Sequence, residues 1–168
     1  MANQIDILAF AAHPDDVELA ASGTLLAHKA LGKTIGIVDL TRGELGSRGS
    51  AEIRKVEAAK SAKILNLDHR SNLALKDGFF EINQESLLKV IEAIRLLKPN
   101  LVLANSLSDR HPDHGRGAEL VARACFLSGL KKIETTRNGI VQEPHRPKQL
   151  LHYIQDNYLA PDVVMDIS

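Results

Sequence analysis

Residues 5–18 read IDILAFAAHPDDVE. The first seven form a short apolar run that only Asp6 interrupts, which is typical of a buried strand. A histidine, a proline and two adjacent carboxylates end the run, and the pattern then predicts a helix from Asp16 to Leu31, closed by Gly32. A buried strand, a polar loop and a helix in this order are the first unit of an α/β fold.

The same order of strand, loop and helix repeats along the chain. Apolar runs and breaks predict strands at 34–40, 71–75, 100–105, 150–154 and 162–167, and helices at 50–65, around 87–94 and at 114–128. We therefore predict a Rossmann-like, mainly parallel sheet with helices on both faces. Ligands bind at the carboxyl ends of such strands, so the loops after the first, second and fourth strands should meet at one site.

The composition favours a single domain that acts on a small molecule. With 168 residues and 44% hydrophobic content, the chain can bury a sizeable core. Its 21 basic and 21 acidic residues give no overall charge that favours nucleic acid or an anionic membrane. The opening apolar run is too short to span a bilayer and follows no basic leader, so we expect a cytoplasmic protein. The single cysteine, Cys125, cannot form an internal disulfide and fits a buried helical position.

Two histidine and aspartate clusters carry the candidate chemistry. The first places His13, Asp15 and Asp16 at the end of a buried strand. Adjacent carboxylates are costly there unless a cation, a proton or several hydrogen bonds compensate, although one of them can also simply cap the helix. The second cluster, residues 111–114 with the sequence HPDH, follows the fourth strand at the same predicted edge. Two histidines and one carboxylate are the protein ligands of many hydrolytic zinc sites, so zinc is the predicted cofactor.

The Gly-rich loop 42–49 is a candidate rim of this site. It lacks the Lys-Ser/Thr ending of a P-loop, and the first turn lacks the glycine spacing of a dinucleotide site, so nucleotide binding is disfavoured. Its glycines permit a tight backbone. Arg48 and Arg54 are available to meet a substrate oxyanion or carboxylate, and the alternative for both is a solvated helix face.

Three motifs resemble those of the PIG-L/LmbE-like de-N-acetylases: AHPDDVE at 12–18, TRGE at 41–44 and HPDH at 111–114. The resemblance extends across essentially the whole chain. It implies that zinc is bound by a set of three residues, His13, Asp16 and His114.

The resemblance also implies roles for the neighbours of these ligands. Asp15 would be the general base, and His111 would stabilise the oxyanion or protonate the leaving amine while Asp113 orients it. Arg54 would contact the substrate. Arg110 would help with a substrate carboxylate or pair with Asp113.

Within the family the chain is most similar to deacetylases that act on N-acetylglucosaminyl malate in bacillithiol biosynthesis. We therefore expect one domain, residues 1–168, that ends before the C-terminal helices usual in the family and forms a homo-oligomer. The expected reaction is zinc-dependent hydrolysis of the N-acetyl group of an N-acetylglucosamine conjugate, giving free amine and acetate. Three alternatives stay open: a deacetylase of another conjugate such as an inositol, a metal-dependent phosphoesterase, and a sugar-binding module without turnover.

Overall fold

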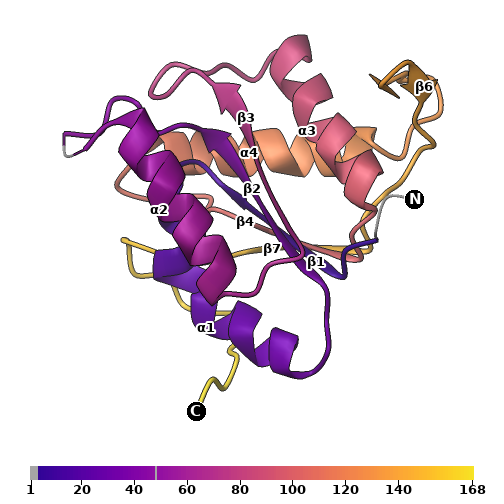
Figure 1. Ribbon diagram of the computed structural model, residues 1–168. Coiled ribbons are helices and arrows are strands. Elements are labelled where there is room, and N and C mark those ends of the chain that lie inside the picture. Colours follow the sequence, from indigo (N-terminus) through magenta and orange to yellow (C-terminus); the bar gives the residue numbers. More distant parts are fainter. Residues whose placement is uncertain (1–3, 48) are drawn as a thin grey trace.

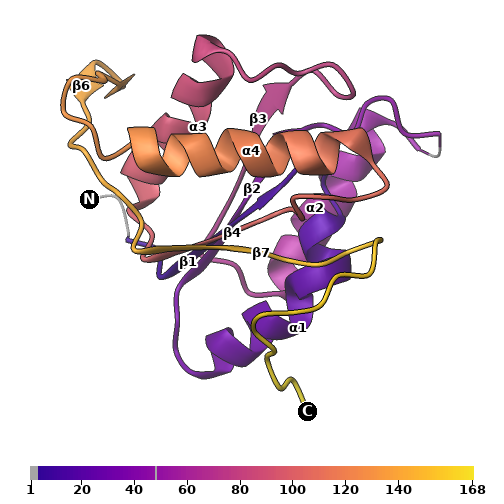
Figure 2. The same ribbon diagram turned by 180° about the vertical axis from the view of Figure 1, so that it is seen from behind.

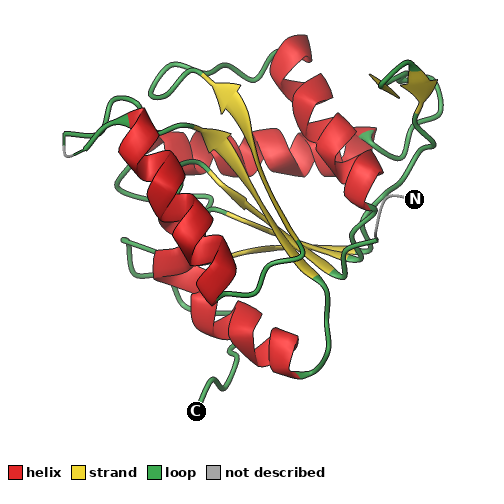
Figure 3. Ribbon diagram, viewed as in Figure 1, coloured by secondary structure: helices red, strands yellow, loops and turns green. Residues whose placement is uncertain are grey.

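The computed structural model describes residues 4–47 and 49–168. Its main sheet has five strands, all parallel to their neighbours, in the order β3-β2-β1-β4-β7. The strands are drawn in yellow in Figure 3, with helices in red around them. The strands are β1 (Ile7–Ala11), β2 (Ile35–Thr41), β3 (His69–Leu75), β4 (Leu101–Ala104) and β7 (Gln149–His152). This is the strand order of a Rossmann-like sheet, so the predicted fold class is confirmed.

Two helices cover each face of this sheet. On one face lie α1 (Asp16–Ala30) and α2 (Ala51–Ile64), which are in front in Figure 1. On the other lie α3 (Gln84–Leu97) and α4 (Pro112–Leu127), and Figure 2 shows α4 running across the back of the sheet. The predicted arrangement with helices on both faces is therefore present.

The central strand β1 explains why its sequence is apolar without alternation. All five of its residues are buried, because each face of the strand meets a different core. Leu8 and Phe10 belong to the core beneath α3 and α4, whereas Ile7 belongs to the core beneath α1. The one charge in the run, Asp6, lies before the strand and accepts hydrogen bonds of 2.9 Å from both the backbone N–H and the hydroxyl of Thr34.

The other helices follow from local signals at their ends. Ser50 and Asn83 cap α2 and α3 by accepting hydrogen bonds from the backbone N–H groups of Ile53 and Ser86. On the back face, Cys125 is buried in α4 as predicted, and this burial raises the pKa of its thiol to about 12. The cysteine is thus a core residue.

Two parts of the C-terminal region differ from the prediction. The connection 131–147 contains a short hairpin, β5 (Thr136–Arg137) and β6 (Ile140–Val141), which projects from the body near the end of α3 (Figure 1). Asn138 and Gly139 form its two-residue turn with φ of 51° and 77°, as a type I′ turn requires.

The strand predicted at 162–167 is wrong. This segment has no strand structure, and it lies along α1, where a Cβ added at Gly23 would come within 2.6 Å of Ile167. Val163 and Val164 are exposed, so these apolar side chains are not buried against the sheet. No helix among the described residues is long and apolar enough to cross a membrane.

Candidate active site

The carboxyl ends of the parallel strands meet at one edge of the sheet, and a cavity of about 540 Å³ lies there. Its walls include residues from the loops after β1, β2, β3 and β4, together with a segment after β7. Most of the predicted site residues line this cavity: His13, Asp15, Asp16, Arg54, Arg110, His111 and His114. The loops after β1, β2 and β4 were predicted to meet at this site. The loop after β3 was not.

Asp16 lies between the two histidines that the sequence paired with it. Its carboxylate is 3.6 Å from Nδ1 of His13 and 3.2 Å from Nε2 of His114. Ligand atoms around a tetrahedral zinc ion are about 3.4 Å apart. Both distances from Asp16 are close to this value, although they start from different oxygens of its carboxylate, and the donor set of two imidazoles and one carboxylate suits zinc.

Each of the two histidines has a buried carboxylate on its other ring nitrogen. Nε2 of His13 is 3.0 Å from Asp77, and Nδ1 of His114 is 2.8 Å from Asp109. Carboxylates in this position fix the ring and the tautomer of metal-binding histidines. Neither residue was predicted from the sequence to have a role, although both follow strands at the predicted site edge.

Hydrogen bonds also hold Asp16 ionised. Oδ2 accepts from the backbone N–H of His13 and from Asn105, and Oδ1 accepts from Gln155. Burial alone would favour the protonated acid, but the bonds to His114 and His13 outweigh it and hold the pKa of Asp16 well below its usual range.

The partner histidines carry the compensating charge. Burial lowers the pKa of His114, but its bonds to Asp16 and Asp109 raise it to about 9. For His13 too, interactions with Asp16 and the nearby carboxylates outweigh burial and raise the pKa. A metal ion bound beside Asp16 would therefore take the place of the positive charge that protonated His13 and His114 supply.

His111 stands beside this cluster as the N-cap of α4. Its ring centroid is 4.6 Å from that of His13 and 5.2 Å from that of His114, and the three rings offer nitrogens within 4.8 Å of one another. Burial and the charges of these two neighbours lower the pKa of His111. The protonated form of His111 is thus disfavoured.

Asp113 contacts His111 in a way that the prediction did not specify. Its backbone N–H donates a 3.2 Å hydrogen bond to Nδ1 of His111. Its buried carboxylate instead accepts from the backbone N–H of Gly78 at 2.8 Å and from Arg116 at 2.6 Å. Asp113 therefore orients His111 through the backbone, while its carboxylate ties α4 to the loop after β3.

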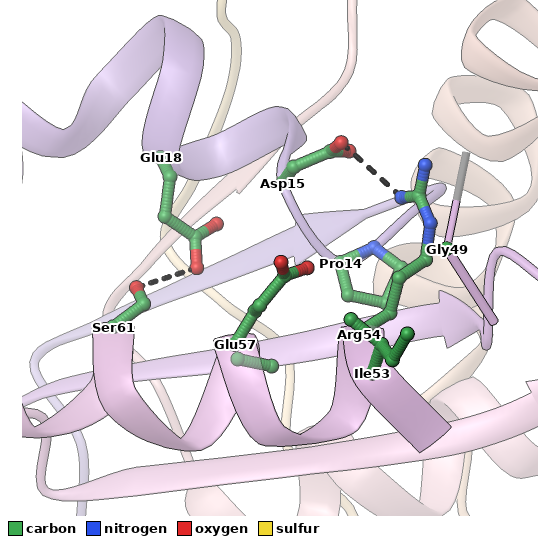
Figure 4. A pocket seen from close by; sticks show the side chains of 9 residues that line it. Pro14, Asp15, Glu18, Gly49, Ile53, Arg54, Glu57 and Ser61 are labelled. Carbon is green, nitrogen blue, oxygen red and sulfur yellow. Dashed lines mark hydrogen bonds and ion pairs between the residues drawn. The ribbon is translucent and has the colours of Figure 1, made fainter. Parts of the chain in front are cut away.

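Asp15 differs from Asp16 because its side chain is about half exposed. Its carboxylate pairs with Arg54 of α2 at 3.2 Å, on the wall of a second cavity of about 400 Å³ that Glu18, Glu57 and Ser61 also line (Figure 4). The Gly-rich loop passes closely over Arg54, since a Cβ at Gly43 would lie 2.9 Å from its side chain. The loop glycines therefore make room for the arginine.

The two remaining predicted residues are Arg110 and Arg48. Arg110 lines the cavity with a side chain that is 76% exposed, and it pairs with Asp156 at 3.4 Å. The predicted alternative partner, Asp113, is bound to Arg116. Arg48 lies outside the described residues.

A parallel α/β sheet with a histidine and carboxylate cluster at the carboxyl ends of its strands defines a Rossmann-like protein with a candidate metal centre. The family model described as PIG-L, GlcNAc-PI de-N-acetylase, matches residues 8–125. The chain therefore belongs to the PIG-L family, and the resemblance seen in its motifs is confirmed.

The chain is also similar to two curated relatives and one solved structure. A probable N-acetyl-alpha-D-glucosaminyl L-malate deacetylase 2 from Bacillus anthracis is 28% identical over 137 residues, which cover 74% of this chain and 61% of the relative. A 4-oxalmesaconate hydratase from Pseudomonas putida is 25% identical, with 98% and 68% covered. A crystal structure of a conserved protein from Thermus thermophilus is 42% identical, has a TM-score of 0.89, and is matched over 98% of this chain and 73% of its own. The chain thus spans about 61% of the length of the Bacillus relative.

Proposed function

We propose that this protein hydrolyses the N-acetyl group of an N-acetylglucosamine conjugate and releases a free amine and acetate. One observation carries the proposal: Asp16 lies between two histidines, each held by a buried carboxylate, with the half-exposed Asp15 beside them. The family and the Bacillus relative support the reaction class. A metal-binding set of this kind beside an available carboxylate suits hydrolysis.

His13, Asp16 and His114 would hold zinc in this proposal. When bound, zinc supplies Lewis acidity towards a carbonyl oxygen and lowers the pKa of water. The two imidazole ligands are the reason for choosing this ion over calcium or magnesium, which prefer sites built from oxygen ligands.

Asp15 is the group that takes a proton from the attacking water. It lies in the wall of the cavity, adjacent in sequence to a ligand, and half of its side chain is open to solvent. Its partner Arg54 holds the carboxylate from the α2 side and leaves the other side of the group free to accept a proton (Figure 4).

His111 is the group that stabilises the oxyanion by donating a hydrogen bond, while the proton that Asp15 takes from water passes to the departing nitrogen. Because Nδ1 accepts the N–H of Asp113, the neutral ring carries its own proton on Nε2 and can donate it in a hydrogen bond. The backbone bond also fixes the ring at the start of α4. One rigid contact thus sets both the orientation and the tautomer of the donor.

For the substrate we propose N-acetylglucosaminyl malate, in the bacillithiol pathway of the cytoplasm. The support is the Bacillus relative and the presence of two arginines, Arg54 and Arg110, on the walls of the cavity. Arg110 is exposed and pairs, among the described residues, with Asp156 alone, so its guanidinium can turn to a carboxylate of the aglycone.

Addition of water to an unsaturated tricarboxylate is the second candidate. It is favoured by the Pseudomonas hydratase, whose match covers 98% of this chain. Both reactions need an activated water and a proton donor, and they differ in the bond that the water attacks.

A substrate panel separates these functions. Zinc-loaded protein is incubated with N-acetylglucosaminyl malate, free N-acetylglucosamine, 4-oxalmesaconate and an aryl phosphate, and free amine, hydration and phosphate are measured. We expect free amine, released much faster from the malate conjugate than from the free sugar. The matched controls are the Asp15→Asn and His28→Gln variants, since the ring of His28 lies in α1 and bonds, within the described part of the chain, only to Thr24. Hydration or phosphate release without free amine would overturn the proposal, and binding without turnover would favour a sugar-binding module.

A further inference from the structure

The loop after β3 connects three other loops of the site. Asp77 and Gly78 lie in this loop, and Asp77 is only 5% exposed. The backbone N–H of Gly78 donates to Asp113 at the start of α4, and its carbonyl accepts from Arg116. Asp77 itself reaches the loops after β1 and β2. The loop after β3 therefore holds the loops after β1, β2 and β4 together.

The two oxygens of the Asp77 carboxylate serve different segments. Oδ1 lies 3.0 Å from Nε2 of His13, and Oδ2 accepts a 2.8 Å hydrogen bond from the backbone N–H of Leu45 in the Gly-rich loop. The Gly-rich loop also contacts Asp77 through Glu44. The carboxylate of Glu44 accepts hydrogen bonds from the backbone N–H of Asp77 at 3.1 Å and from that of Arg42 at 3.2 Å. A candidate metal ligand and the rim of the cavity therefore share one buried carboxylate.

We propose that Asp77 is a positioning residue that couples the order of the Gly-rich loop to metal binding at His13. With Oδ1 it holds the His13 ring so that Nδ1 faces Asp16, and with Oδ2 it holds the loop at Leu45. Metal binding at His13 fixes the ring and thereby stabilises the carboxylate position that the loop needs. The linkage is reciprocal, so an ordered loop also strengthens metal binding.

An amide cannot replace this carboxylate. Both partners of Asp77 present N–H donors when His13 binds a metal through Nδ1, and a carboxylate has an acceptor oxygen for each. Asparagine has one acceptor oxygen and one NH₂ group, so it satisfies one donor and turns an N–H towards the other. Asp77→Asn therefore breaks the connection while it keeps the size of the side chain.

Asp109 provides a matched control. It holds the other histidine, His114, at 2.8 Å, and its second oxygen accepts from the backbone N–H groups of Arg110 and Asn157. It makes no hydrogen bond to the Gly-rich loop among the described contacts. Asp109→Asn therefore makes the same chemical change behind a metal ligand without touching loop 42–47.

The experiment measures zinc affinity and loop cleavage in the wild type and both variants. Competition with a chromophoric chelator gives the zinc affinity, and trypsin cleavage after the exposed Arg42 gives the opening of the loop. We expect zinc to slow this cleavage in the wild type. Both variants should bind zinc about 10- to 100-fold more weakly. At saturating zinc, Asp109→Asn should regain the protection of the loop and Asp77→Asn should not.

Several outcomes would overturn the coupling. These are a wild-type loop that zinc does not protect, an Asp77→Asn loop that saturating zinc protects fully, or unchanged zinc affinity in Asp77→Asn. If Asp77→Asn fails to fold, Glu44→Gln replaces it, because this change disturbs the loop at Asp77 and Arg42 without touching His13. It should weaken zinc binding through the loop alone, and an unchanged affinity would contradict the proposal. Neither readout needs turnover, so the result is independent of the proposed reaction.

Discussion

Asp15 and Asp16 are neighbours in the chain with opposite surroundings. Asp16 is 2% exposed and accepts hydrogen bonds from a backbone N–H and two amide side chains, with both candidate ligand histidines beside it. Asp15 pairs with Arg54 and has an open side. The first environment suits a fixed anionic ligand, and the second suits a group that gains and loses a proton.

We therefore expect Asp16→Asn and Asp15→Asn to fail in different ways. Asp16→Asn replaces an anionic ligand by a neutral amide, so zinc content should fall, and added zinc should restore part of the activity. Asp15→Asn should keep its zinc and lose about 10²- to 10⁴-fold in kcat, because a proton acceptor is missing. Metal analysis and kcat at matched zinc test this. Loss of zinc in Asp15→Asn alone would mean that Asp15 is the ligand and Asp16 the base. Full activity in both variants would mean that this is not the active site.

The second prediction at this scale concerns Arg54. Arg54→Ala should raise KM for an anionic conjugate more than for free N-acetylglucosamine, because a charge-assisted contact to the remote part of the substrate is lost. Arg110→Ala is the matched comparison at another point on the wall of the cavity. Equal changes in KM for both substrates would mean that Arg54 serves only its partner Asp15.

The sequence was informative about some of these residues and silent about others. That His13, Asp16 and His114 would lie together was predictable, because their clusters follow strands whose ends meet at one edge. Asp77 was not, since its link to His13 spans 64 positions and the third strand was a weak signal. Gln155 was missed for the same reason, because its bond to Asp16 depends on where the edge strand β7 ends.

Among the elements, α3 and the end of α4 are joined by a buried arginine. Arg95 is 2% exposed and donates to the backbone carbonyls of Ser128, Leu130 and Ile133 and to the hydroxyl of Thr135. Its head group thus satisfies carbonyls at and just beyond the end of α4, where a helix leaves acceptors without partners.

We expect Arg95→Met to lower the free energy of unfolding by about 3 kcal/mol, because it leaves several buried acceptors without a donor. Arg123→Met is the control, since Arg123 is exposed on α4 and its only ion pair among the described residues is with Glu119, and it should change stability by less than about 0.5 kcal/mol. Urea unfolding followed by circular dichroism gives both values. Equal stabilities would show that water replaces the arginine at this junction.

The elements themselves were predictable to different degrees. The helix over residues 51–64 was expected within one residue at each end, because Ser50 is a clear cap before a long polar and alanine-rich run. The hairpin at 136–141 was missed, since two-residue strands carry no periodic signal and only the Asn138-Gly139 pair marks the turn. The run 162–167 is apolar like a buried strand, but β7 already ends the sheet on that side and offers it no described partner.

For the whole molecule, the homo-oligomer expected from the sequence stays a prediction, and α2 is where it can be tested. This helix has no buried residue, and its apolar side chains Ile53, Val56 and Ile64 are 51%, 54% and 78% exposed. We expect sedimentation velocity to give a mass above that of one chain, and Val56→Glu to lower it while the circular dichroism spectrum is unchanged. A single-chain mass at every concentration would contradict the prediction.

The position of β1 at the centre of the sheet also has a consequence during synthesis. Its residues pair with β4, so that Ile7 meets Leu101 only after more than 90 further residues have been made. At the usual rate of about 5 to 20 residues per second, one edge of this apolar strand stays open for about 5 to 20 s on the ribosome. An open apolar edge can pair with other chains. The nascent protein should therefore aggregate more readily than the finished one, and slower expression at low temperature, or more chaperone, should raise the soluble yield.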